Sequence, residues 1–364
     1  MKTIKKHLLI AIALILSFSA SAQYHRQSSD LYFPDIKGYQ TLKCDFHIHT
    51  IFSDGQVWPD YRVTEAIMDG IDVIAITDHI EYIPHENELK GDFNTAYEIA
   101  KKEGDKYGVM VIRGAEITRS MPPGHLNAIF IKDANKLDVE DVEDAIAEAY
   151  NQGAFIFWNH PCWKAQQPDT VKWFEIHTRL YDKGYIHGIE VVNFGQFCPE
   201  AWNWAIEKDL TIMSNSDIHS TTCMSKFEKH RPVTLVFAKE FSHNSVRNAL
   251  DNKRTLLYYN ETLYGNKDFL SQLLQNSLII KKRYDKDQNI VIFDITNISS
   301  APVILYRHKD LPPRSVPGKL EIPAKSNIHF HVDLDRVDSK TIWFGVGNYI
   351  YDIDKNLEFE LKLK

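Results

Sequence analysis

The stretch from Cys44 to Gly55 contains the residue types of a metal site, with two histidines two positions apart and an aspartate five positions later. His47 and His49 end an apolar segment, and residues i and i+2 of an extended chain point to the same face. Both imidazoles can therefore face one point, and neutral imidazole is the commonest metal ligand in proteins. A second His-x-His pair, His329 and His331, lies in an ordinary surface-type strand and receives no function, so the first pair needs support from elsewhere in the chain.

Further histidines and carboxylates occur at intervals along the chain, nearly all of them after apolar runs. They are Asp78, His79, Glu116, His125, His160, Glu190, Asp217 and His219. In a parallel α/β barrel the loops that follow the strands meet at one rim, which carries the active site. Burying so many histidines and carboxylates together would be costly unless cations neutralise them. The pattern favours a multinuclear metal site over a purely structural polar cluster.

The elements that must position these residues alternate between strand-like and helix-like segments over residues 40 to about 257. Residues 63–67 form the apolar face of a predicted helix that Gly70 ends, and residues 139–150 predict a second helix. This alternation predicts a parallel α/β barrel or a doubly wound sheet. Apolar runs, several of them apolar on both faces as in strands covered by helices, predict strands at residues 72–77, 109–112, 127–131, 154–158, 188–192 and 210–213.

After residue 268 the pattern changes to short alternating strands separated by turn-rich loops, which predicts a small antiparallel β-sandwich. This region contains no constellation of metal ligands or nucleophiles. Packing on the barrel rim is the default role, and glycan binding and oligomerisation are the alternatives. The strands are predicted at residues 278–282, 290–295, 302–307, 328–334, 341–346 and 357–363.

The first 22 residues have the form of an export signal. Three lysines precede the apolar run of residues 8–16, and Ala20-Ser21-Ala22 is a small-x-small cleavage site. The apolar run is too short for a membrane anchor. We therefore expect an exported protein, periplasmic or secreted, with residues 1–22 as signal peptide, 23–39 as an N-terminal lead-in, 40–268 as the barrel and 269–364 as the β-sandwich.

The charge of the chain limits its partners. Removing the signal segment, which holds three lysines and no acid, takes the formal charge from −7 to −10. This charge disfavours general binding to nucleic acid or to anionic membranes. A small phosphorylated substrate held by metal ions remains compatible with it, because bound cations reverse the local field.

Four cysteines remain in the chain, at positions 44, 162, 198 and 223. An exported protein can form disulfides, but the count alone does not assign pairs. Buried free thiols are the preferred interpretation, with a disulfide or a metal ligand near the site as the alternatives.

The ordered motifs of the chain resemble those of the PHP superfamily, the polymerase and histidinol phosphatase group of metal-dependent phosphoesterases. The resemblance covers roughly residues 42–265 and rests on the segments 45–50 with 53–55, 75–79, 114–116, 159–161 and 216–219. It implies a distorted (β/α)7 TIM-like barrel that holds two to three divalent metal ions (Zn, Mn or Fe).

The resemblance also implies which residues bind these ions. His47, His49, Glu116 and Asp217 would hold the first ion, and Glu116 would bridge to a second ion that His125 and His160 complete. Asp54, His79 and His219 would hold the third. Some family members have histidine at the position of Asp54, which leaves the choice of metal open.

The implied reaction is hydrolysis of a phosphate mono- or diester by a metal-bridging hydroxide. Asp78 could act behind ligand His79 as a hydrogen-bond acceptor or could cap a local turn. Arg119 and Arg231 are candidate phosphate clamps, although an ordinary salt bridge is the alternative for each.

Two other functions remain open from the sequence. Metal-activated water also attacks carbonyl carbon, so the substrate could be a non-phosphate ester or a carbamate. The chain could instead be a non-catalytic metal- or surface-binding module that uses the β-sandwich for recognition.

Overall fold

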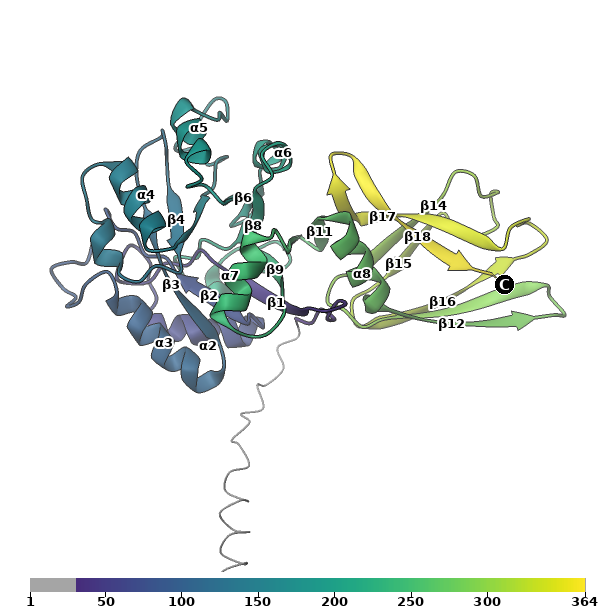
Figure 1. Ribbon diagram of the computed structural model, residues 1–364. Coiled ribbons are helices and arrows are strands. Elements are labelled where there is room, and N and C mark those ends of the chain that lie inside the picture. Colours follow the sequence, from purple (N-terminus) through teal and green to yellow (C-terminus); the bar gives the residue numbers. More distant parts are fainter. Residues whose placement is uncertain (1–30, 364) are drawn as a thin grey trace, which may run out of the picture.

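The computed structural model describes residues 31–363, and the predicted signal segment at residues 1–22 lies outside them. Figure 1 shows a mixed α/β part, which carries the earlier elements, beside a β-rich part that ends the chain. Within the described residues, no helix combines the length and the apolar character that crossing a bilayer requires.

The α/β part alternates strands and helices, and the six strands predicted there are confirmed. Its strands are β1 (Gln40–Asp45), β2 (Val73–Ile76), β3 (Met110–Ile117), β4 (Leu126–Ile129), β5 (Phe155–Trp158), β6 (Gly188–Asn193), β7 (Gln196–Phe197), β8 (Thr211–Asn215), β9 (Val233–Ala238), β10 (Thr255–Tyr259) and β11 (Thr262–Gly265). Its helices are α2 (Pro59–Asp69), α3 (Thr95–Tyr107), α4 (Val142–Asn151), α5 (Glu175–Asp182), α6 (Pro199–Glu207) and α7 (His243–Asp251), with the 3₁₀ turns η1 (Ala134–Leu137) and η2 (Thr222–Met224). Every residue of β2, β4 and β5 is buried, which explains their unbroken apolar sequences.

The central sheet is mixed rather than wholly parallel. Its strands follow the order β11-β10-β9-β1-β2-β3-β4-β5-β6, and β8 pairs with β6. The strands β1, β2 and β3 are parallel, but β4 runs antiparallel to both β3 and β5, and β9 runs antiparallel to β1. The reversal of β4 brings its N-terminal end to the same edge of the sheet as the C-terminal ends of β3 and β5.

The hydrogen-bonded strand order does not close into a ring among the described residues. Between β8 and β9, the Thr234 hydroxyl donates to the Ser214 carbonyl at 2.9 Å and accepts from the Ser214 N–H at 2.8 Å. Beyond the ends of β1 and β8, the Asp217 N–H donates to the His47 carbonyl at 2.9 Å and the His49 N–H donates to the Ile218 carbonyl at 3.1 Å. Local contacts therefore join the two segments that carry four of the predicted ligands.

The helix ends follow the local sequence. Helix α2 ends where predicted, because Gly70 adopts the left-handed conformation (φ 77°) that favours glycine. Helix α4 begins at Val142 rather than at residue 139, because the Asp141 side chain accepts hydrogen bonds from the N–H groups of Glu143 and Asp144.

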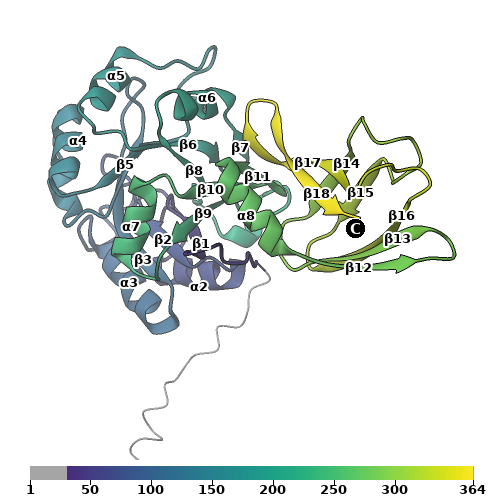
Figure 2. The ribbon, with the colours of Figure 1, turned by 45° about the vertical axis from the view of Figure 1, so that its right-hand side comes forward.

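The β-rich part begins after α8 (Lys267–Ser277), and the six strands predicted there are confirmed. It contains β12 (Leu278–Asp285), β13 (Ile290–Asn297), β14 (Val303–Arg307), β15 (Lys319–Ile322), β16 (Ser326–Asp333), β17 (Thr341–Asp352) and β18 (Lys355–Lys362). The short strand β15 was not predicted. The strands pair antiparallel as two sets, β12-β13-β16 and β15-β14-β17-β18 (Figure 2).

The core of this part lies between the two sets of strands. The ring of Phe330 on β16 stacks on Phe293 of β13, with 5.5 Å between centroids, and meets Phe344 of β17 edge-on at 6.5 Å. These rings are nearly fully buried. Alternate residues of β13 are buried, as period-2 patterning requires of a sheet with one apolar face.

The two parts of the chain are in direct contact. Strand β11 pairs parallel with β17, with Leu263 opposite Tyr349. The Asn348 amide donates hydrogen bonds to the Glu261 carbonyl at 2.9 Å and to the Pro302 carbonyl at 2.8 Å. Helix α8 contains residues 268 and 269, between which the sequence predicts the domain boundary. The position of this boundary stays a prediction.

A histidine outside the predicted cluster, His177, is fully buried near the start of α5. Its Nδ1 accepts the Phe174 N–H at 3.0 Å and its Nε2 lies 2.7 Å from the Pro123 carbonyl, which requires a neutral ring with the proton on Nε2. Burial lowers the pKa of His177 to about 4, against its ordinary 6.5, and the hydrogen bond to Pro123 only partly offsets this effect.

We expect this histidine to make folding stability depend on pH. Below pH 6.5 the unfolded chain binds a proton that folded His177 accepts only near pH 4, so the free energy of unfolding falls as the pH falls through this window. The loss is about 2 kcal/mol at pH 5. Urea unfolding of His177→Gln should show a smaller difference between pH 7 and pH 5, whereas His329→Gln on β16 should behave like the wild type. An unchanged difference in His177→Gln would contradict the assignment.

Candidate metal centre

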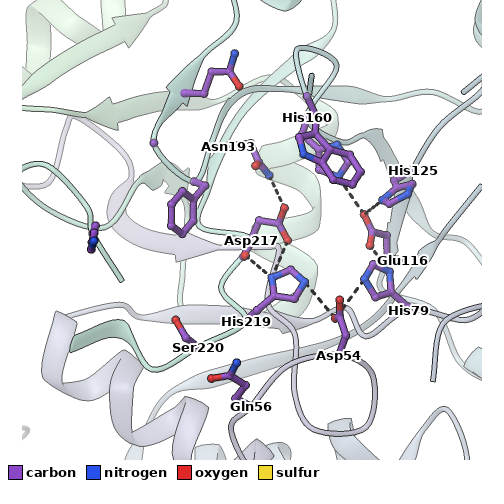
Figure 3. Close-up of a pocket in the computed structure, with 15 residues that line it drawn as sticks. Asp54, Gln56, His79, Glu116, His125, His160, Asn193, Asp217, His219 and Ser220 are labelled. Carbon is purple, nitrogen blue, oxygen red and sulfur yellow. Dashed lines mark hydrogen bonds and ion pairs between the residues drawn. The ribbon is translucent and has the colours of Figure 1, made fainter. Parts of the chain in front are cut away.

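All nine predicted metal ligands lie at one edge of the central sheet, and seven of them line one cavity (Figure 3). His47, His49 and Asp54 lie just after β1, and the remaining residues apart from His125 lie at the ends of β2, β3, β5 and β8. His125 precedes β4 and reaches the same edge only because that strand is antiparallel to its neighbours. The nine are His47, His49, Asp54, His79, Glu116, His125, His160, Asp217 and His219.

The group expected for the first ion is compact and almost fully buried. His47 Nε2 lies 3.0 Å from His49 Nε2, 3.4 Å from Glu116 Oε1 and 3.2 Å from Asp217 Oδ1. His49 Nε2 lies 3.1 Å from Asp217 Oδ1 and 3.8 Å from Glu116 Oε2. Four potential ligand atoms therefore surround one point, which suits a divalent cation.

Glu116 lies between this group and the second one. Its Oε1 is 3.1 Å from His125 Nδ1 and 3.5 Å from His160 Nε2, in addition to the contact with His47. Its Oε2 is 2.6 Å from His79 Nδ1. One carboxylate thus contacts histidines from all three expected groups, which is the position of a bridging ligand.

The third group is centred on Asp54. Its Oδ1 lies 3.1 Å from His219 Nε2 and 3.4 Å from His79 Nε2. His49 Nδ1 approaches the same oxygen at 3.9 Å. The Asp54 side chain is 27% exposed, so this group lies nearer the solvent than the first one.

The turn that carries Asp54 is held by Asp78. The Asp78 carboxylate accepts hydrogen bonds from the Thr50 N–H at 2.6 Å, the Thr50 hydroxyl at 2.7 Å and the Ser53 hydroxyl at 2.7 Å. A side chain at Gly55 would meet the Thr50 carbonyl at 2.7 Å, so only glycine fits there. Of the two roles predicted for Asp78, these contacts favour holding the turn.

The two arginines predicted as phosphate clamps do not line the central cavity. Arg231 is buried and bonds Asp45 at 2.7 Å and Asp69 at 3.1 Å, and these carboxylates raise its pKa although burial would lower it. Arg119 pairs with Glu81 and donates to the Val139 carbonyl at 2.8 Å. Each guanidinium is therefore engaged in structural bonds, which favour the salt-bridge alternative, and the clamp role stays a prediction.

The sequence noted Glu190 at the end of its strand but assigned it no role. Its Oε1 lies 2.9 Å from His47 Nδ1, and its Oε2 accepts the His160 N–H at 2.9 Å. A carboxylate at Nδ1 fixes the proton there and leaves Nε2 free to bind a metal. The sequence signal for this role was a single acidic residue inside the apolar strand β6. Glu190 is only 1% exposed. Asn159 similarly donates to Glu116 Oε1 at 2.6 Å.

The histidines and carboxylates shift one another's pKa values strongly. Burial would raise the pKa of Glu116, but His79, His125 and His47 outweigh it and hold that pKa well below its ordinary value. Conversely, burial would lower the pKa of His79, but Glu116 and Asp54 raise it to about 10. Burial, together with the charges of His79 and His219, lowers the pKa of His49 to about 3.

Several features of the cluster fit bound cations better than a purely structural network. His160 Nδ1 is buried and has no hydrogen-bond partner among the described residues, which is costly without a further partner, and the buried oxygens Asp54 Oδ1 and Glu116 Oε2 contact only histidines of the cluster. His160 (φ 31°) and Asp217 (φ 50°) have left-handed backbones, a strained conformation that concentrates at functional sites. The imidazole and carboxylate donors suit divalent metal ions.

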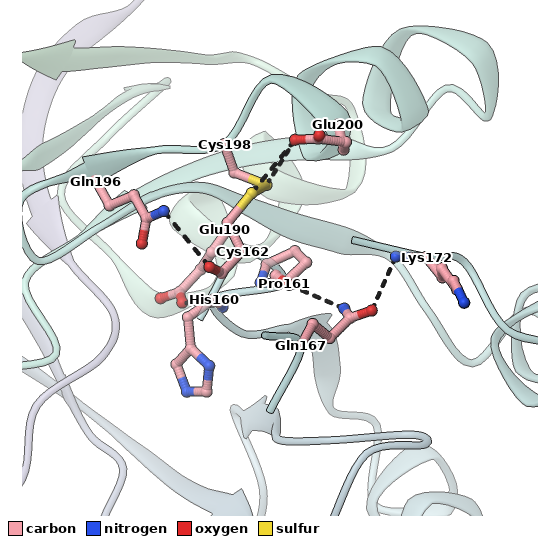
Figure 4. The surroundings of a disulfide bond; sticks show 9 residues. All are labelled: His160, Pro161, Cys162, Gln167, Lys172, Glu190, Gln196, Cys198 and Glu200. Carbon is pink, nitrogen blue, oxygen red and sulfur yellow. Dashed lines mark hydrogen bonds between the residues drawn. A yellow bond between two sulfur atoms is a disulfide. The ribbon is translucent and has the colours of Figure 1, made fainter. Parts of the chain in front are cut away.

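The expectation of free thiols is wrong for two of the four cysteines. Cys162 and Cys198 form a disulfide, whereas Cys44 is a buried free thiol and Cys223 is free and exposed. The disulfide joins the segment after His160 to the segment before α6 (Figure 4). The partners are 36 residues apart, and closing a loop of this length stabilises the fold by about 3–4 kcal/mol in the chain-entropy model.

The fold and the cluster define an α/β protein with a polynuclear metal-type site at one edge of its sheet. A family model for the PHP domain matches residues 45–201, which include seven of the nine clustered residues. A solved two-domain protein from Bacteroides vulgatus, described as containing a predicted PHP-like metal-dependent phosphoesterase, is 40% identical, with a TM-score of 0.87. That match covers 94% of this chain and 100% of that one. The chain belongs to the PHP family.

A shorter match is to an uncharacterized protein of Methanocaldococcus jannaschii, 37% identical over 84 residues, or 22% of this chain and 36% of that protein. The chain thus spans about a third of the length of this curated relative.

Proposed function

We propose that this protein is a metal-dependent phosphoesterase that hydrolyses a phosphate mono- or diester. The observation that carries the proposal is the position of Glu116, whose two oxygens lie between the His47, His49 and Asp217 group and the His125 and His160 pair. Two or three divalent ions held there would activate water near neutral pH and neutralise phosphate oxygens.

The protein's own residues prepare this site. Glu190 keeps the proton of His47 on Nδ1, so that Nε2 faces Glu116 and Asp217. Asp78 holds the turn that presents Asp54. The central cavity of about 770 Å³ leaves room for a substrate much larger than phosphate.

Further proposals concern the setting of this activity. We assign the α/β part to a distorted (β/α)7 barrel and the β-rich part to a β-sandwich, and we place the protein outside the cytoplasm, periplasmic or secreted. The Cys162–Cys198 disulfide supports an exported protein, because disulfides persist in oxidising compartments. The partner is a small phosphorylated molecule rather than nucleic acid in general or a membrane.

A panel of substrates tests the reaction. Purified protein loaded with Mn²⁺, Zn²⁺ or Fe²⁺ is offered phosphomonoesters, phosphodiesters and carboxyl esters of the same alcohols. We expect phosphoester hydrolysis with at least one metal and its loss on chelation. Faster carboxyl-ester hydrolysis would favour the ester or carbamate alternative, and no turnover with any metal would favour a binding module.

A further inference from the structure

We propose that Trp163 and Phe194 form a subsite for a flat unsaturated ring in the leaving group, and this inference rests on the proposed phosphoesterase function. Both residues line the cavity that contains the metal-type cluster. Both are large aromatic side chains left substantially exposed, Trp163 by 44% and Phe194 by 42%. The substrate class would be an aryl- or heteroaryl-bearing phosphoester.

Trp163 stands directly beside the second group of ligands. Its ring meets His160 edge-on at 5.2 Å between centroids and His125 at 5.7 Å. The backbone N–H of Trp163 donates to the His160 carbonyl at 2.9 Å, which fixes the Trp163 backbone relative to that ligand. A leaving group attached to a phosphate at the cluster would therefore lie within reach of the indole.

Phe194 is held in a conformation that folding alone does not favour. It lies in the turn between β6 and β7 with φ 53°, a left-handed backbone that is unfavourable for a bulky residue. Its N–H donates to the Asn215 carbonyl at 3.1 Å, and its ring touches Phe227 at 5.2 Å. Glycine or asparagine would suit this turn better, so a half-exposed phenylalanine there points to binding.

The two aromatic residues belong to segments that the disulfide joins. Cys162 immediately precedes Trp163, and Cys198 lies four residues after Phe194. Figure 4 shows the bond between these segments, with the Gln196 amide 3.4 Å from the Cys162 carbonyl. The disulfide limits the motion of both segments, and a preorganised binding surface binds a ring at less entropic cost.

The other residues at the cavity favour a neutral ring over a second anionic group. Lys226 is the one lysine or arginine among the described residues that line it. The side-chain amides of Gln56 and Gln196 also line it and offer donors and acceptors to ring heteroatoms. A substrate with several phosphates far from the cluster would find little positive charge here.

Two matched pairs of compounds test the subsite. The hydrolysable pair is 2-phenylethyl phosphate and 2-cyclohexylethyl phosphate, whose alcohols leave with the same chemistry. The second pair is the corresponding phosphonates, which bind without being hydrolysed and are measured by calorimetry on metal-loaded protein. We expect about a two- to twelve-fold preference for the phenyl member in both KM and Kd, the range of aromatic pairing.

Variants then locate the preference. Trp163→Ala should abolish it with metal content unchanged, Trp163→Phe should retain it, and Phe194→Gly should reduce it while keeping or raising Tm. Trp343→Ala, an exposed tryptophan of β17, is the control and should leave the preference intact. If Trp163→Ala loses metal, the phenyl preference of Phe194→Gly alone tests the subsite.

The possible failures are distinguishable. Equal affinity of wild-type protein for the two phosphonates, or an undiminished preference in both Trp163→Ala and Phe194→Gly, would overturn the subsite. A phenyl preference in binding without any phosphoester turnover would support the subsite and overturn the phosphoesterase proposal.

Discussion

Replacing Glu116 by glutamine should lower kcat/KM for phosphoester hydrolysis by about 100- to 1,000-fold, on the scale of removing an essential electrostatic group. The substitution keeps the side-chain size but removes the charge that lies between the three ligand groups. Glu116 Oε1 is within 3.5 Å of His47, His125 and His160, and a neutral amide oxygen cannot hold two cations together there. The bound metal should fall by at least one ion per chain.

The fold should survive this change, because Glu116 lies at the rim of the sheet and the apolar cores around it are untouched. Circular dichroism and elemental analysis separate loss of metal from loss of structure. Glu143→Gln is the control, since Glu143 is also an ion-paired carboxylate, bonded to Arg179 and Lys183, but on the exposed face of α4. Near-normal turnover in Glu116→Gln would show that the bridging position is misassigned.

The location of the cluster could be predicted from the sequence because buried strands have a recognisable apolar pattern, and the end of that pattern marks the end of the strand. The segments ending in His49, His79 and Glu116 are buried on both faces, so their apolar runs mark strands, and the polar residues after them mark one edge. His125 was assigned to the cluster by the resemblance and not by a place after a strand. It precedes its strand, and only the antiparallel direction of β4, which no local pattern encodes, turns it towards Glu116.

The contacts that the sequence did not predict depend on long-range geometry. Asp45 and Arg231 are 186 residues apart, and their bond engages a residue that was predicted as a phosphate clamp. Glu190 and His47 are 143 residues apart, and nothing in either segment pairs them. The disulfide also depends on long-range geometry. Four cysteines allow three sets of pairs, and only the fold brings Cys162 next to Cys198.

The second large effect is expected at Asp54, the most exposed carboxylate of the cluster. Asp54→Ala should release the third ion selectively, because Asp54 Oδ1 is the atom that both His79 Nε2 and His219 Nε2 approach. The first and second groups keep all their ligands. Burial would raise the pKa of Asp54, but its ion pairs with His219 and His79 hold that pKa well below its ordinary value, so the charge is present at any working pH.

Loss of the third ion should weaken substrate binding at least as much as it slows the chemical step. We expect KM to rise about 10-fold or more, with partial rescue by excess metal, on the scale of other single substitutions at metal sites. Asp54→Asn should behave similarly, since a neutral amide is a poor ligand. Asp60→Ala, in the first turn of α2, removes a nearby carboxylate outside the cluster and should keep metal content and KM near those of the wild type.

The alternative is that Asp54 only stabilises its own turn. The contacts speak against this, because Asp78 and Thr50 already hold the turn and Asp54 Oδ1 faces His79 and His219 rather than the backbone of its own turn. Under the turn-stabilising alternative, both variants would retain every ion and Asp54→Asn would be nearly silent in kinetics. Metal counting by elemental analysis, together with steady-state kinetics on the two variants, therefore decides whether Asp54 binds an ion: full occupancy in both would refute the ligand role.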